Sequence, residues 1–149
     1  MAGITRKIRA VALQTLYEMD SSGHDAHLVL SRLAGEENLS QEATSSAREL
    51  IDGVVSKLQE IDKIIQERAP DFPPAQLAIV DRSLLRIAIW EVLFDNRTPP
   101  KVAINEAVEL AKKFGASNSY RFVNGVMGSV MASRQHAQSA LSGTSKGKE

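Results

Sequence analysis

The sequence has no cysteine among its 149 residues, and only 5% of its residues are aromatic. Without cysteine there are no disulfides, no thiolate metal ligands and no cysteine nucleophile, so stability must come from packing. No long apolar run follows the charged residues 1–9, which argues against a secretory signal or a membrane span. We therefore expect one cytoplasmic domain, because this length suffices for one sizeable core but rarely for two.

The formal net charge is zero, but the charges are distributed unevenly along the chain. Residues 1–17 contain three basic residues and no acid, and residues 110–148 contain six basic residues and no acid. The segment between them, 18–109, is net acidic. If the two ends of the sequence meet in the fold, one face is basic, which suits a polyanion bound at a defined site.

No segment alternates with the strand period of two, whereas apolar residues recur at helical spacing almost everywhere, so the predicted fold class is all-α. The first helix should end before the turn-forming residues 20–23. Its apolar stripe consists of Ile4, Ile8, Val11, Ala12, Thr15 and Met19. Further helices are predicted at about 25–34, from a Ser40 cap to Pro70, at 77–94, at 101–114, and from residue 117 or 118 onward.

Two details concern the C-terminal third of the chain. Gly115 stands where a left-handed helix cap is expected. Beyond Ser133 the sequence becomes polar, small and unpatterned, so we expect a helical domain over 1–134 and a disordered tail over 135–149.

Catalytic motifs are missing from the sequence: there is no Gly-rich phosphate loop, nucleophile elbow or Ser/His/Asp constellation. Glu106 and Glu109 lie beside two lysines at helical spacing, which favours surface ion pairs over an acid/base pair. His24 and His27 could converge on a metal ion, but no further ligand cluster accompanies them. We expect neither enzymatic activity nor a cofactor or metal.

The first helix carries a second organised face. On a helical wheel Arg6, Arg9, Leu13 and Tyr17 fall within about 80° of one another, opposite the apolar stripe. One interpretation is that the arginines, with neighbouring Lys7, clamp phosphates through their forked donors while Leu13 and Tyr17 contact a protein. The alternative is that Leu13 and Tyr17 belong to the core and the arginines are its solvated end.

A second basic stretch, residues 112–122, mixes cations with aromatic rings and amides. Unpaired bases stack on aromatic rings, amides can bind base edges, and cations hold the backbone, so the mixture favours single-stranded RNA. The two phenylalanines fit equally well as core anchors at helix ends. The candidate RNA-binding residues here are Lys113, Phe114, Asn118, Tyr120, Arg121 and Phe122.

The segment 101–114, KVAINEAVELAKKF, followed by FVNGV at 122–126, resembles the signature of the NusB family. The segments 6–9 (RKIR) and 85–91 (LRIAIWE) extend the resemblance to about residues 4–131. It implies a fold of two three-helix bundles. It also implies a transcription antitermination factor that binds the boxA element of ribosomal RNA transcripts together with the ribosomal protein NusE, and joins RNA polymerase with other Nus factors.

By position, the resemblance implies RNA contacts at Arg6, Lys7, Arg9, Phe114, Asn118 and Phe122, and contacts to the ribosomal protein at Tyr17, Asp81 and Arg86. Two alternatives stay open. The chain could be the recognition module of a separate RNA-modifying enzyme, because it also resembles the N-terminal part of ribosomal RNA cytosine methyltransferases. It could also be a homodimerisation module that buries its N-terminal arginines.

Overall fold

The structure is a computed structural model that describes the backbone of residues 3–147 and the side chains of residues 3–134. Within this part the chain forms helices and no strands, which confirms the predicted all-α class. The elements are α1 (Arg6–Ser22), α2 (Ala26–Glu36), α3 (Gln41–Ser56), α4 (Leu58–Arg68), the 3-10 turn η1 (Pro74–Gln76), α5 (Ile79–Ile89), the π-helical turn η2 (Trp90–Asp95), α6 (Pro100–Phe114) and α7 (Ser119–Gly147).

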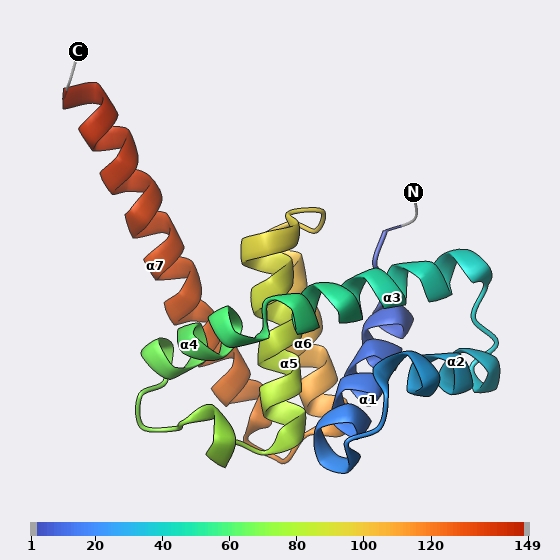
Figure 1. Cartoon of the computed structure of the whole chain (residues 1–149). Helices are drawn as coiled ribbons and strands as arrows, with labels where there is room; N and C mark the ends of the chain where they lie inside the picture. The colour runs from blue at the N-terminus through green and yellow to red at the C-terminus, as the bar shows by residue number, and fades with distance from the viewer. Residues whose placement is uncertain (1–2, 148–149) are drawn as a thin grey trace.

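The helices form two groups (Figure 1). Helices α1, α2 and α3 pack against one another, and α5, α6 and α7 form the second group, with α4 against α5 and α7. Helix α1 also packs along α5 and so joins the two groups. This arrangement agrees with the two bundles that the resemblance implies. None of the described helices is long and apolar enough to cross a membrane.

Helix α1 is longer than the sequence predicts. Its predicted apolar stripe does face the core, but the helix continues through residues 20–22. It ends at Gly23, whose φ of +70° is left-handed and whose N–H donates to the carbonyl oxygen of Met19 at 3.0 Å. At the other end the Thr5 hydroxyl accepts from the N–H of Ile8 at 3.2 Å.

The prediction of a single helix between Ser40 and Pro70 is wrong, because the helix is interrupted at Lys57, which has φ −112° and ψ 16°. The Ser56 hydroxyl donates to the carbonyl oxygen of Gly53 at 2.8 Å and so competes with the helical hydrogen bonds there. Helix α3 packs on α1 and α2, whereas α4 packs on α5 and α7. The break therefore marks the point where the chain passes from one group to the other.

Helix α5 is the centre of the core: its residues 83–89 are all buried. This α-helix is shorter than the one predicted over 77–94, because the chain changes at Trp90 into the π-helical turn η2. This turn ends at Asn96, which has a φ of +63° and donates its N–H to the carbonyl oxygen of Glu91. The Trp90 ring packs against the backbone of Gly53, which places a glycine inside α3 for a packing reason.

A buried ion pair joins the start of α1 to η2. Arg9 and Glu91 are 2% and 0% exposed, and two guanidinium N–H groups donate to the two carboxylate oxygens at 2.8 and 2.7 Å. The remaining donors of Arg9 reach the carbonyl oxygen of Ile4 at 2.8 Å and the hydroxyl of Thr98 at 3.3 Å. Arg9 thus makes four hydrogen bonds, all within the fold.

A second ionic network joins the end of α1 to α4 and α5. The Asp20 carboxylate accepts from Arg82 at 2.7 Å and from Arg86 at 3.1 Å. Arg86 also donates twice to Asp62 of α4, at 2.9 Å each. Because Arg9 and Asp20 contact opposite ends of the α5–η2 segment, α1 and α5 are antiparallel and fixed in register.

Helix α6 ends differently from the prediction. Gly115 has φ −91° and ψ −177°, so it is extended and the expected left-handed cap is wrong. A glycine is still required, because a Cβ would lie 2.5 Å from the Ser119 Cβ and 2.8 Å from the Ala111 carbonyl oxygen. Helix α7 then continues to Gly147. The tail predicted over 135–149 lies outside the residues whose side chains are described, and it stays a prediction.

Replacing Gly53 by alanine tests the contact with Trp90. We expect Gly53→Ala to lower the free energy of unfolding by about 1–3 kcal/mol, because the new Cβ would overlap the indole ring. Gly128→Ala in α7 is the matched control, since no atom of the described residues, beyond its chain neighbours and the backbone of its own helix, lies within 4 Å of the added Cβ. It should be neutral or stabilising by up to about 1 kcal/mol. Equal urea midpoints for the two variants would contradict the packing argument.

Removing Glu91 tests the buried ion pair. We expect Glu91→Ala to cost about 3–5 kcal/mol, because it leaves the Arg9 charge buried without its partner. The double variant Arg9→Met, Glu91→Leu should recover most of this loss, since it removes both charges together. Urea unfolding followed by circular dichroism measures both effects, and wild-type stability of Glu91→Ala would show that the pair is not structural.

Candidate nucleic-acid interface

The start of α1 presents Arg6 and Lys7 to solvent. The Arg6 Nε donates to Glu106 of α6 at 2.7 Å, with 56% of the arginine side chain and 18% of the glutamate side chain exposed. This hydrogen bond raises the pKa of Arg6 above its ordinary value. Lys7 has no carboxylate partner among the described residues. The first basic segment therefore lies beside α6.

The end of α6 brings the second basic segment to the same side of the molecule. The Lys113 ammonium lies 5.2 Å from the centre of the Phe114 ring. Phe114 is half-buried and lines a cleft with Leu13 and Tyr17 of α1. Helix α1 therefore lies along α6, with Arg6 at the middle of α6 and with Leu13 and Tyr17 at its end.

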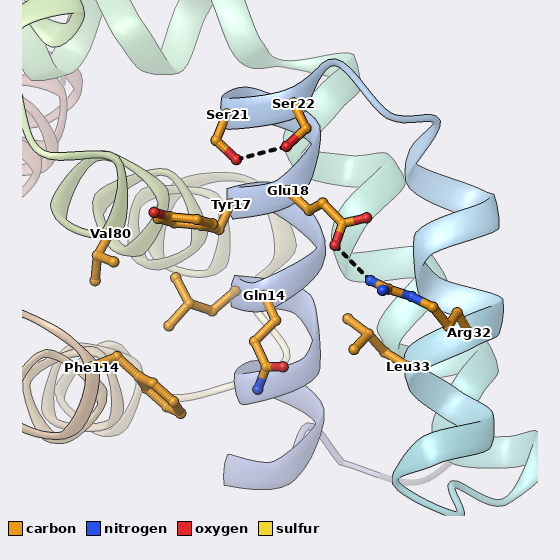
Figure 2. A pocket seen from close by; sticks show the side chains of 10 residues that line it. Gln14, Tyr17, Glu18, Ser21, Ser22, Arg32, Leu33, Val80 and Phe114 are labelled. Atoms are coloured by element: carbon orange, nitrogen blue, oxygen red, sulfur yellow. Dashed lines mark hydrogen bonds and ion pairs between the residues drawn. The ribbon is translucent and has the colours of Figure 1, made fainter.

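The cleft has a volume of 540 Å³ and lies between α1, α2 and the adjoining ends of α5 and α6. In Figure 2 the Tyr17 side chain points from α1 towards the side of Val80 and Phe114, whereas Glu18 points to the other side, towards Arg32 and Leu33 of α2. Tyr17 is 43% exposed, whereas Leu13 is buried. The second face predicted for α1 is therefore divided: Arg6 and Tyr17 are accessible, and Arg9 and Leu13 belong to the interior.

The connection between α6 and α7 leads from this cleft to a pair of aromatic rings. Asn118 is exposed, and the neighbouring Ser119 hydroxyl accepts from the N–H of Ala116 at 2.9 Å, which orders the loop. Phe122 is half-buried and meets Phe72 edge to face, with ring centres 5.4 Å apart. Phe114 and Phe122 thus combine a packing role with an accessible edge.

Phe72 was not among the candidates from the sequence. It is 53% exposed and lines a cavity of 310 Å³ together with Arg68, Arg121 and Phe122. The available signal was an aromatic residue between Pro70 and Pro73, where no helical stripe could account for it. An aromatic side chain in such a segment is a candidate for binding rather than for the core.

Tyr120 and Arg121 lie at the start of α7. Tyr120 is half-buried, and its ring has the Arg121 guanidinium at 5.3 Å and the Lys112 ammonium at 5.6 Å from its centre. Two residues of helix separate Tyr120 from Phe122 by about 160° around the axis. Tyr120 therefore faces α6, and Arg121 lies between the two aromatic side chains.

Two arginines predicted to contact binding partners instead form ion pairs inside the fold. Arg9 is buried with Glu91, so we assign it a structural role and leave it out of the RNA surface. Arg86 is 6% exposed and bound to Asp20 and Asp62, so it is likewise left out of the protein surface. Asp81 is half-buried, and its Oδ1 has no hydrogen-bond partner among the described residues.

The remaining polar candidates form surface contacts. Glu109 pairs with Lys112 at 2.9 Å, and the hydrogen bond from this lysine lowers the pKa of Glu109. Glu109 thus forms the predicted ion pair within α6, whereas Glu106 pairs with Arg6 of α1 instead of a neighbouring lysine. His24 contacts Glu18, and His27 contacts Asp52 on α3. No group of three or more potential metal ligands occurs in the part of the chain that the structure describes.

Comparison with known proteins adds independent information. The family model described as the NusB family matches residues 6–132. The chain is 46% identical over 134 residues to the transcription antitermination protein NusB of Roseiflexus sp. (strain RS-1), covering 89% of this chain and 94% of that protein.

Two solved structures are also similar. NusB of T. maritima matches with a TM-score of 0.77 and 32% identity, covering 85% of this chain and 89% of that one. A crystal structure of antitermination factors NusB and NusE in complex with dsRNA matches with a TM-score of 0.79 and 27% identity, covering 86% and 96%. Family model, sequence relatives and fold agree over nearly the whole length, and the chain therefore belongs to the NusB family.

Proposed function

We propose that this protein is a non-enzymatic antitermination adaptor that binds the boxA element of ribosomal RNA as a single strand. The observation that carries the proposal is the surface along which α1 lies beside α6 and leads to the start of α7, with Arg6 at Glu106 and with Leu13 and Tyr17 at Phe114. Exposed cations and accessible aromatic edges adjoin each other there. The RNA-binding residues proposed are Arg6, Lys7, Lys113, Phe114, Asn118, Arg121 and Phe122, with Phe72 added and Tyr120 at the margin.

The chemistry of this surface favours unpaired bases. Phe72 and Phe122 offer ring edges and faces on which a base can stack, and such stacking requires bases that are not already in a duplex. The related NusB–NusE structure contains dsRNA, so the strandedness of the RNA is part of the proposal that must be tested. Arg6 would exchange its contact with Glu106 for an RNA phosphate.

We further propose that the cleft around Tyr17 is the docking site for the ribosomal protein NusE. A protein named NusE accompanies NusB in the related structure. The cleft offers an exposed tyrosine beside the half-buried Val80 and Phe114, and aromatic anchors in such surroundings dominate many protein interfaces. Asp81, the half-buried next residue on α5, would lie beside the docked protein. The complex would then join RNA polymerase with other Nus factors.

Replacing Phe122 by leucine tests the RNA surface. Leucine keeps apolar volume against Phe72 but removes the aromatic ring, so we expect boxA RNA binding to weaken by about 1–3 kcal/mol. Fluorescence anisotropy with labelled single-stranded and duplex boxA RNA measures the effect. The matched control is Leu28→Ala, which alters an exposed apolar residue of α2. Wild-type affinity of Phe122→Leu, or a preference for the duplex, would contradict the proposed mode of binding.

Replacing Tyr17 by alanine tests the protein surface. We expect affinity for purified NusE to fall by about 2 kcal/mol, as for other tyrosine anchors, while affinity for RNA alone stays near that of the wild type. Isothermal titration calorimetry with NusE, and anisotropy with RNA, give the two values. If Tyr17→Ala binds NusE as tightly as Leu28→Ala does, the cleft is not the docking site.

A further inference from the structure

A second groove, distinct from the cleft of Figure 2, lies between α6 and α7. It has a volume of 410 Å³, and its polar lining consists of Lys101, Asn105, Lys112, Tyr120, Arg121 and Asn124. Two aliphatic side chains, Ile104 and Val108, complete its lining. Four of the six polar residues, Lys101, Asn105, Lys112 and Asn124, lie outside the RNA surface proposed above.

The charge of this groove is positive, and no acid lines it. Lys101 and Arg121 have no carboxylate partner among the described residues. Lys112 is shared between Glu109 and the Tyr120 ring, at 2.9 Å from the carboxylate and 5.6 Å from the ring centre. The groove therefore presents uncompensated positive charge beside an aromatic ring.

The groove is long rather than round. Lys101 and Lys112 are separated by eleven residues of α6, which corresponds to about 16 Å along the helix. The side-chain amides of Asn105 and Asn124 lie between these ends. Amides can donate to and accept from base edges, while the lysines at the ends suit phosphates. A site of this length and polarity fits a short run of nucleotides better than a single one.

The groove is continuous with the proposed RNA surface through one side chain. Arg121 lines both this groove and the cavity that contains Phe72 and Phe122. A strand that stacks on Phe122 can therefore cross the start of α7 at Arg121 and continue along α6. An acidic protein segment is a poorer fit, because the lining lacks the large exposed apolar anchor that protein interfaces use.

We propose that the α6–α7 groove binds the nucleotides adjoining the boxA element, on the same RNA strand. This inference rests on the proposed function, because it extends the RNA path beyond that surface. It assigns phosphate contacts to Lys101 and Lys112 and base contacts to Asn105, Asn124 and the Tyr120 ring. The groove then makes affinity depend on the length of the RNA as well as on the boxA element itself.

The test uses the full chain and two sets of fluorescent single-stranded RNAs: boxA alone, and boxA lengthened at its 5′ or 3′ end. The groove variant is Lys101→Ala with Asn124→Ala. The matched control is Lys63→Ala with Gln59→Ala, which removes the same charge and one amide from exposed positions of α4. Circular dichroism checks that both variants fold, and anisotropy is measured over a range of salt concentrations.

We expect wild type and control to bind one of the lengthened RNAs more tightly than boxA alone, and the groove variant to lose that gain. Log affinity for this RNA falls as log salt rises, and losing the Lys101 phosphate contact should make that negative slope shallower by about 0.7. A 4-thiouridine in the extension should crosslink to residues 120–124. Equal binding of the lengthened RNA by groove variant and control, or crosslinks only elsewhere, would overturn the groove proposal.

The experiment separates the two levels of inference. If wild type fails to bind boxA RNA of any length, the proposed function itself is wrong. If wild type binds boxA alone and lengthened RNAs equally, the proposed function stands and the groove inference is wrong.

Discussion

The antiparallel pairing of α1 with α5 is held at both ends by buried or partly buried charged groups, and the cleft around Tyr17 and the position of Arg6 depend on it. At one end Arg9 meets Glu91, and at the other Asp20 meets Arg82 and Arg86, which reaches on to Asp62. Such groups are costly to bury without a partner, and this alignment of the helices pairs them all. The contacts thereby specify where α1 lies relative to α6, and so bring Arg6 to Glu106 and Leu13 to Phe114.

Helix periodicity predicted the fold because the apolar side chains repeat with it. It did not show the break at Lys57, which has no glycine or proline to mark it and arises where α3 and α4 pack on different helices. Nor did it show which arginines are internal. The partner of Arg9 lies 82 positions away in the sequence, and the acids that hold Arg86 belong to α1 and α4. Spacing along one helix cannot identify a partner on another, so Arg6 and Arg9 looked equivalent although one is exposed and the other is not.

The candidate site was predictable to the extent that its chemistry is local. Cations and aromatic residues are mixed within residues 112–122, and Phe114 of that stretch does lie beside Leu13 and Tyr17 of α1. What the sequence could not give is the division of this stretch around α7, where Phe122 turns towards Phe72 and Tyr120 turns towards α6. It also could not show that Glu106 lies within the basic surface and already holds Arg6. An anion at this place must compete with a carboxylate, which favours polyanions over isolated small anions.

The two ionic clamps on α1 have a consequence for how this helix can vary among related proteins. Inserting or deleting one residue between Arg9 and Asp20 would rotate one end of the helix by about 100° relative to the other. Either Glu91 would then lose Arg9, or Arg82 and Arg86 would lose Asp20, which would leave Asp62 as the remaining carboxylate bound to Arg86. Residues on the exposed faces of α1 can be substituted without breaking these ion pairs, whereas the number of residues between Arg9 and Asp20 cannot change. Because Arg6 and Tyr17 are on the same clamped helix, the separation between the two surfaces that they mark is constant.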